Sequence, residues 1–269
     1  MASMFACSAD RIPPVLRECY WQIKSKFLYQ TLYRALHLEH KLRSGLTVKV
    51  RSMGEWWVYN DIFVDCEYDL AIHEAMRRAA DRSGKSRPFT VLDLGANVGY
   101  FAFRVLDLLD APDRNRLDIT MIEGSPKNFA ELRERIEAAE IQPEQKTLIC
   151  GLAGDRNGTA FIRESAIHVK STLIHTATAK GTEVPFSNLD EVMRGKREID
   201  LLKCDIEGSE LALVRNYPGL LGKVRTAVFE WHHEQCDTKE ARRILNNLGF
   251  SETPLRDHGS FSLSLFTRD

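Results

Sequence analysis

The chain has 269 residues, of which 43% are hydrophobic and 28% are charged, and its formal net charge at pH 7 is −1. This length suits one large α/β domain with an N-terminal extension, and the charge balance argues against a dedicated nucleic-acid binder, whose surface would be strongly basic. No apolar run is long enough to span a bilayer, and residues 1–10 lack the layout of a signal peptide. The six cysteines form no CxxC pair, so we expect a reducing cytoplasmic location and neither a disulfide framework nor a zinc site.

The N-terminal part begins with residues 12–42, in which apolar side chains recur at helical spacing with basic residues between them. This pattern predicts one or two helices packed on the main domain. The alternatives are a membrane-surface helix and a dimerisation helix that would make the protein a homo-oligomer. Val48 and Val50 then alternate with charged residues, and residues 55–64 ("EWWVYNDIFV") are interpreted as a β-rich stretch.

Residues 70–80 again have a helical period, and the polar stretch 81–88 that follows them contains a glycine and a proline. Such a stretch is typical of a boundary between domains. We therefore expect a helical and β-hairpin extension over residues 1–85 and the main domain over residues 86–269.

In the main domain, strands alternate with helices, which is typical of a parallel sheet covered by helices on both faces. The predicted strands cover residues 90–94, 117–124, 146–153, 199–208 and 226–234, and the predicted helices cover 100–109, a segment that begins after Ser125 as N-cap, 210–215 and 239–248. Near the end, Phe261, Leu263 and Leu265 alternate with serines. This alternation predicts a half-exposed antiparallel hairpin at the end of the sheet.

The segment 155–192 has no helical period, but it contains strand-like pieces at 159–164 and 182–186. Its polar middle includes His168 and His175, which are outside candidates for catalysis. A connection this long inside a compact domain is usually functional, so we expect a lid over the substrate. The alternative is a solvated excursion without a role.

The loop "DLGANVG" follows the first predicted strand of the main domain and begins at Asp93. A dinucleotide fingerprint would need glycines at positions 95, 97 and 100, but this chain has Gly95, Asn97 and Tyr100 there. No Walker sequence follows either. A carboxylate at Asp93 would repel a diphosphate but attract an ammonium or sulfonium group. Asn97 is able to adopt the left-handed conformation that glycine would otherwise supply, and Gly99 is the second glycine of the loop.

Glu123 ends the next predicted strand. In folds of this type, an acid at that position accepts hydrogen bonds from ribose hydroxyls. A ligand with a ribose, a cationic part and no phosphate is S-adenosylmethionine. The alternative interpretation is a tight turn between strand and helix with a surface acid beside it.

Five stretches together resemble the FkbM-type family of S-adenosylmethionine-dependent methyltransferases: "VLDLGANVGYFAFR", "MIEGSPKNF", "SNLDEV", "IDLLKCDIEGSE" and "FEWHH". The resemblance covers residues 90–233. It implies a Rossmann-like class I methyltransferase fold, with a mainly parallel seven-stranded sheet that ends in an antiparallel hairpin. It also implies O-methylation of a hydroxyl on a sugar, a glycan or a polyketide-type natural product.

Carried onto this chain, the resemblance implies a set of cofactor-binding residues. Glu123 would hold the ribose with Gly124 and Ser125 beside it, Leu152 would lie near the adenine, and Asp205 would face the methionine end. The cofactor loop would consist of Asp93, Gly95, Asn97 and Gly99.

The catalytic candidates follow two strands that we expect to be neighbours, one ending at Asp205 and the other carrying Glu230 and His232. His232 is the first candidate for the base that removes the acceptor's proton, and Glu230 would orient it; the alternative is that the His232 ring only packs at the rim. Lys203 either pairs with a carboxylate or acts in catalysis if burial lowers its pKa. In a second arrangement, Asp205, Glu230 and His232 hold Mg²⁺ or Mn²⁺, which would lower the pKa of the acceptor hydroxyl.

Two other classes of function remain open. A methyltransferase that acts on amino groups of DNA would carry an Asn/Asp-Pro-Pro-aromatic loop, whereas this chain has "DIEG" from Asp205, which is acidic where a phosphate backbone would approach. A methyltransferase acting on protein and a non-catalytic S-adenosylmethionine-binding module are the remaining alternatives. The sequence favours a small-molecule or glycan acceptor.

Overall fold

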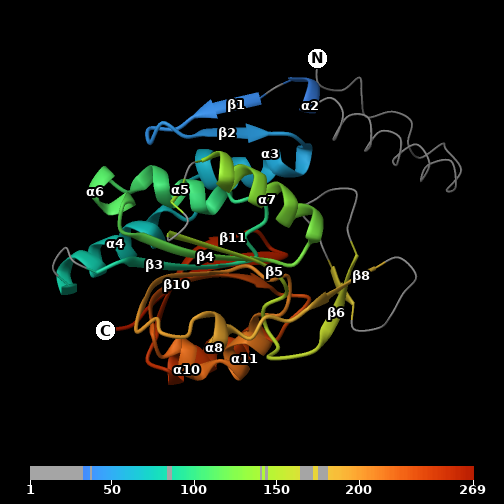
Figure 1. Cartoon of the computed structure of the whole chain (residues 1–269). Coiled ribbons are helices and arrows are strands. Elements are labelled where there is room, and N and C mark those ends of the chain that lie inside the picture. The colour runs from blue at the N-terminus through green and yellow to red at the C-terminus, as the bar shows by residue number, and fades with distance from the viewer. Residues whose placement is uncertain are drawn as a thin grey trace, which may run out of the picture.

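The computed structural model of the chain describes residues 33–36, 38–83, 87–139, 141–142, 145–163, 172–174 and 181–269. Its centre is a seven-stranded sheet with the order β11-β12-β10-β9-β3-β4-β5 (Figure 1). The strands are β3 (Phe89–Leu94), β4 (Leu117–Glu123), β5 (Lys146–Cys150), β9 (Ile199–Cys204), β10 (Val224–His232), β11 (Ser251–Asp257) and β12 (Phe261–Thr267). The five strands from β10 to β5 are parallel, and β12 is antiparallel to both of its neighbours. The predicted fold class is therefore confirmed.

Helices cover both faces of this sheet (Figure 1). One face carries α4 (Asp69–Ser83), α5 (Tyr100–Leu108) and α7 (Pro126–Ala138); the other carries α9 (Glu210–Asn216), α10 (Pro218–Leu221) and α11 (Thr238–Asn247), and the short helices α6 (Ala111–Arg114) and α8 (Leu189–Val192) lie in connections. Successive strand residues supply the two cores in alternation, since Val91 packs in one core and Leu92 in the other. Strands such as β3 and β9 are buried along their whole length, so the sheet forms the middle of three layers.

Ser125 caps α7 as predicted, because its side chain accepts a hydrogen bond from the backbone N–H of Asn128. Gly249 follows α11 with φ +87°, as expected for a glycine that ends a helix. Within the part of the chain that is described, no helix has the length and apolar character needed to cross a membrane, and the cysteines there are free. The cytoplasmic location stays a prediction.

The first described elements form a hairpin rather than the end of a long helix. The helix α2 (Tyr33–Leu36) is one turn long, and β1 (Leu38–Lys41) pairs antiparallel with β2 (Thr47–Val50). The helix predicted over 12–42 is therefore wrong at residues 38–41, because Val48 and Val50 provide a strand with which this segment can pair. Residues 12–32 lie outside the described residues, so the homo-oligomer through this segment stays a prediction.

The stretch 55–64 is helical, so the β-rich interpretation of it is wrong. It forms α3 (Met53–Tyr59) and the π-helical turn η3 (Asn60–Val64). The side chain of Ser52 accepts a hydrogen bond from the backbone N–H of Glu55, and the Glu55 carboxylate accepts one from the backbone N–H of Arg51 at 2.9 Å. This serine–glutamate spacing is a helix-start signal, and it overrides the β-propensity of the aromatic residues, which stack along the helix instead.

Helix α4 confirms the helix predicted over 70–80. Ile72 and Ala75 of this helix are buried in the same core as Val91 and Phe101 of the main domain. The extension therefore shares its core with the sheet, and the division at residue 85 stays a prediction.

The C-terminal hairpin is confirmed, but its predicted half-exposure is wrong for β12. Ser262 and Ser264 are only 7% and 1% exposed. The reason is the strand order: β12 lies inside the sheet between β10 and β11, and its serine face lies under α11, where Arg242 donates a hydrogen bond to Ser262. Strand β11 is the edge strand, and it is the exposed one.

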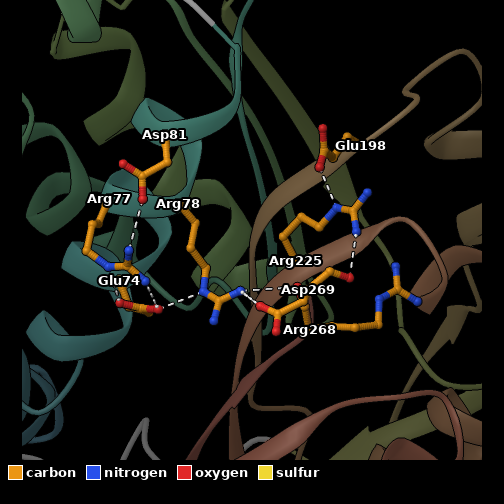
Figure 2. Close-up of polar contacts among 8 residues, drawn as sticks. All are labelled: Glu74, Arg77, Arg78, Asp81, Glu198, Arg225, Arg268 and Asp269. Carbon is orange, nitrogen blue, oxygen red and sulfur yellow. Dashed lines mark hydrogen bonds and ion pairs between the residues drawn. The ribbon is translucent and has the colours of Figure 1, made fainter.

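Arginine side chains bind Asp269 near the amino-terminal ends of the parallel strands. Figure 2 shows Arg78 of α4 donating to the Asp269 carboxylate at 2.9 Å and to Glu74 at 2.6 Å. Arg225 at the start of β10 donates to the backbone oxygen of Asp269 at 3.3 Å and contacts Glu198. Ligands of such sheets bind at the carboxyl ends of the parallel strands, so this network lies at the other end of the strands.

The segment 155–192 contains a separate antiparallel sheet with the order β7-β6-β8 (Figure 1). Its strands are β6 (Thr159–Arg163), β7 (Thr172–Ile174) and β8 (Thr182–Pro185), so the strand-like pieces were predicted correctly. His168 and His175 lie outside the described residues. The small sheet is attached to the segment after β5, because Leu152 donates its N–H to Pro185 at 2.9 Å and accepts from Ser187 at 2.8 Å. Its role as a lid stays a prediction.

Candidate functional site

The loop after β3 has the backbone that its sequence predicts. Gly95, Asn97 and Gly99 have φ values of +76°, +50° and +92°, which confirms the left-handed conformation expected of Asn97. A Cβ atom at Gly95 would lie 1.7 Å from the backbone oxygen of Asp205. Only glycine fits there, so the loop lies directly against the end of β9.

Glu123 connects this loop to the start of α7. Its carboxylate accepts one hydrogen bond from the backbone N–H of Asn97 at 2.7 Å and another from that of Ser125 at 2.8 Å. Burial raises the pKa of Glu123 to about 7. The carboxylate is therefore held in place before any ligand binds, and each oxygen keeps a further lone pair for a ligand hydroxyl.

A cavity, here called the loop cavity, opens beside Glu123. It is lined by Gly95, Asn97, Ile122, Glu123, Gly124, Ser125, Asn128, Gly151, Leu152, Ala153, Ile162, Asp205, Ile206 and Glu207. All the predicted cofactor residues line it except Asp93 and Gly99. Asn128 and Ile162 were not predicted. No local motif marks them, because one faces the cavity from α7 and the other from the inserted sheet.

Asp93 does not line the loop cavity, so its attraction for a cationic ligand stays a prediction. It is fully buried, and its Oδ1 is 3.6 Å from Nζ of Lys203. Burial raises the pKa of Asp93 to about 6. The physical reason for the burial is that β3 continues to Leu94, so Asp93 is still an interior strand residue between β4 and β9.

Lys203 neutralises part of this buried charge. Its ammonium donates to the backbone oxygen of Gly95 at 2.6 Å and to the carboxylate of Asp205 at 3.2 Å. Burial alone would lower the pKa of Lys203, but the charges of Asp205 and Asp93 raise it above its ordinary value. The predicted pairing with a carboxylate is confirmed, and the lowered pKa on which a catalytic role depends is not found.

A second cavity, here called the acidic cavity, adjoins the first and has a volume of about 630 Å³. The two cavities share Asn97, Asp205 and Glu207. The acidic cavity is lined by aromatic side chains and by two basic residues, Lys203 and His232, together with the carboxylates of Asp61, Glu67, Asp205, Glu207, Glu230 and Glu234. Its size falls in the range of roughly 300–1,000 Å³ that is usual for small-molecule sites.

At the junction of the cavities, the predicted catalytic side chains converge. Strands β9 and β10 are neighbours as expected. Nε2 of His232 lies 3.6 Å from Glu230 and 4.0 Å from Asp205. It also lies 3.4 Å from Glu207, a residue that was not predicted although it stands two positions after Asp205.

The His232 ring is oriented by a hydrogen bond that Glu210, and not Glu230, accepts. Nδ1 of His232 lies 3.0 Å from Oε1 of Glu210, which is fully buried at the start of α9. Glu230 instead accepts a hydrogen bond from the Tyr68 hydroxyl at 3.1 Å. Glu210 ends the "DIEGSE" motif, which is the signal by which it could have been found.

The carboxylates around His232 raise the pKa values of both His232 and Glu230. Burial alone would lower the pKa of His232, but the hydrogen bond to Glu210 and the charge of Asp205 raise it above its ordinary range. Burial, together with the charge of Asp205, raises the pKa of Glu230. Each group is therefore a stronger base than usual once it has lost its proton.

The ligand atoms of Asp205, Glu207 and His232 lie within 4.8 Å of one another, close enough to hold one cation. Glu230, which the sequence placed in this set, is not part of the group. Such a group is also common without a metal, so the site for Mg²⁺ or Mn²⁺ stays a prediction.

A family model matches more than half of the chain. Residues 93–252 match the model described as the methyltransferase FkbM domain. A protein of Jannaschia sp. (strain CCS1) named "Putative methyltransferase" is 31% identical over an alignment of 113 positions, and the match covers 37% of this chain. The match covers 40% of the length of that curated relative.

Solved structures similar to this chain have low sequence identity to it. Methyltransferase FkbM from Methylobacillus flagellatus KT is 11% identical, with a TM-score of 0.48 over 96% of this chain and 72% of that one. The magnesium protoporphyrin IX methyltransferase ChlM from Synechocystis PCC 6803, solved with bound SAM, is 12% identical, with a TM-score of 0.43 over 92% of this chain and 95% of that one.

Proposed function

This chain belongs to the methyltransferase FkbM family, and from that premise we propose that it transfers the methyl group of S-adenosylmethionine to a hydroxyl of a sugar, a glycan or another natural product. The observation that carries the proposal is the junction of two cavities at Asn97, Asp205 and Glu207. One cavity has the features of a nucleoside site, and the other has room for a small acceptor. Their contact would bring an acceptor hydroxyl beside the cofactor's methionine end.

The residues of the loop cavity fit this cofactor. S-adenosylmethionine, when bound, supplies an electrophilic methyl group on a positively charged sulfur. Glu123 has free lone pairs for the ribose hydroxyls, and the absence of a side chain at Gly95 keeps the loop close to β9. Asp205 and Glu207 place negative charge at the end of the cavity where the sulfonium would lie, which favours a cation over a phosphate.

The acceptor's proton would leave through the pair of Glu230 and His232. Both side chains line the acidic cavity, and their nearest polar atoms are 3.6 Å apart. Glu210 holds the ring so that Nε2, and not Nδ1, faces the cavity carboxylates. In this pair Glu230 is the base, because the neighbouring carboxylates keep the His232 ring in its charged form. A positioned base contributes about 10²–10⁴-fold to the rate of a proton-transfer step.

The acceptor class separates this proposal from its alternatives. A nucleic-acid acceptor would bring phosphates toward the carboxylates of the acidic cavity, and the repulsion makes that acceptor less favourable. Transfer of the methyl group to protein would indicate a protein acceptor. Transfer to no acceptor would indicate a non-catalytic module. Radiolabelled S-adenosylmethionine incubated with hydroxylated sugars, glycans, natural products, RNA, DNA and protein would show which class receives the label.

The first experiment is calorimetric titration with S-adenosylhomocysteine, with NAD as the control ligand and with Mg²⁺ present or absent. We expect S-adenosylhomocysteine to bind and NAD not to bind. An effect of Mg²⁺ would support the metal arrangement at Asp205 and His232. No binding of S-adenosylhomocysteine would refute the proposed function while leaving the fold as described.

A further inference from the structure

Asn128 is a buried polar residue that the roles assigned so far do not use. It is the third residue of α7 and is 6% exposed. Its backbone N–H donates to Ser125, but no hydrogen-bond partner for its carboxamide exists among the residues that the structure describes. The side chain lines the loop cavity. A carboxamide that lines a cavity and has no partner in the protein keeps its donor and its acceptor available for a ligand.

The neighbours of Asn128 in this cavity form a close apolar slot. A Cβ atom at Gly124 would lie 2.8 Å from Cδ2 of Leu152 and 2.9 Å from Cδ1 of Ile162, so those two side chains lie close over the glycine. Ile162 is 4% exposed and belongs to β6, and the backbone bonds of Leu152 to β8 hold the inserted sheet in place. The slot is therefore formed before a ligand arrives.

The direction of the loop cavity follows from its two ends. Asp205 and Glu207 mark the end shared with the acidic cavity. The apolar end is lined by Leu152 and Ile162. Glu123 and Asn128, five positions apart in sequence, also line the cavity. If the proposed function holds, the charged sulfonium is at the first end and the flat, uncharged base is at the second.

We propose that Asn128 selects the adenine base of the cofactor. Its carboxamide oxygen accepts a hydrogen bond from the 6-amino group, and its carboxamide NH₂ donates to a neighbouring ring nitrogen, while Leu152 and Ile162 cover the ring. An asparagine carboxamide is suited to this pattern because it offers one acceptor and one donor side by side. The inference rests on the proposed function, because it assumes that the loop cavity holds a nucleoside.

The test is a thermodynamic cycle between protein and ligand. The dissociation constants of S-adenosylhomocysteine and of its analogue whose purine lacks the 6-amino group are measured by calorimetry with wild-type protein and with Asn128→Leu. We expect wild type to prefer the amino-bearing ligand by about tenfold, as lost hydrogen bonds of this kind suggest. We expect Asn128→Leu to bind the two ligands equally.

Controls separate the possible failures. Lys127→Leu makes the same kind of change one residue away, at an exposed position outside the cavity lining, and should keep the tenfold preference. Asn128→Ser provides a second variant in case the leucine disturbs folding. If Asn128→Leu weakens both ligands but keeps their ratio, Asn128 does not read the base, and the inference is wrong. If wild type binds neither ligand, the proposed function itself fails.

Discussion

The substitution Gly95→Ala tests the close contact between the loop after β3 and the end of β9. A residue with a Cβ atom pays about 1–2 kcal/mol to adopt the left-handed conformation of Gly95. The new Cβ would also lie 1.7 Å from the backbone oxygen of Asp205. That overlap is relieved only by moving the loop away from β9, and overpacking of this kind adds about 1–3 kcal/mol.

The expected loss of stability is therefore about 2–5 kcal/mol, or roughly 5–20 °C in melting temperature. Gly158→Ala is the matched control, because Gly158 has φ +94° but a Cβ there would meet nothing within 4 Å. It should show only the conformational part of the cost. Scanning calorimetry of both variants measures the difference, and titration with S-adenosylhomocysteine should show at least a tenfold weaker affinity for Gly95→Ala alone. Equal melting temperatures together with unchanged affinity would refute the reasoning.

Three further predictions concern the two cavities. Burial raises the pKa of Glu230 and the charge of His232 lowers it, so His232→Gln should move the acid limb of the turnover–pH profile to higher pH; a limb that stays or moves to lower pH contradicts this sign. Ile162→Ala should weaken S-adenosylhomocysteine binding several-fold by calorimetry, whereas Val184→Ala, in the same small core but outside the cavity lining, should leave the affinity unchanged. Lys203→Met should cost about 3–5 kcal/mol in urea denaturation, because it leaves the buried carboxylate of Asp93 without its partner; a loss below about 1 kcal/mol would mean that the pairing is weak.

Sequence reasoning succeeded where the signal is local. The left-handed turn at Asn97 and the helix cap at Ser125 each depend on neighbouring residues only, and both are confirmed. The same applies to the alternation of strands and helices, which the hydrophobic period encodes. The aromatic stretch 55–64 is helical although its residues favour strands, because the serine–glutamate helix start at Ser52 overrides their β-propensity.

Long-range contacts explain what local patterns did not predict. The burial of Asp93 depends on strands on both sides of β3, and the burial of Ser264 depends on the place of β12 inside the sheet. Asn128 and Ile162 meet in one cavity although 34 positions separate them in the numbering. No local pattern predicts such meetings, because they arise from the sheet order and from how the inserted sheet attaches to the main one.

The place of β12 also bears on how the protein is made. Strand β10, which carries Glu230 and His232, pairs along residues 226–232 with residues 261–267 of β12. While the ribosome is still translating the chain, that side of β10 has no partner until residues 261–267 have emerged. The nascent protein thus presents an open strand edge beside its catalytic candidates, and open edges of this kind invite pairing with other chains. Pairing with β12 closes this edge, so the strand that completes the sheet also shields β10 from other chains.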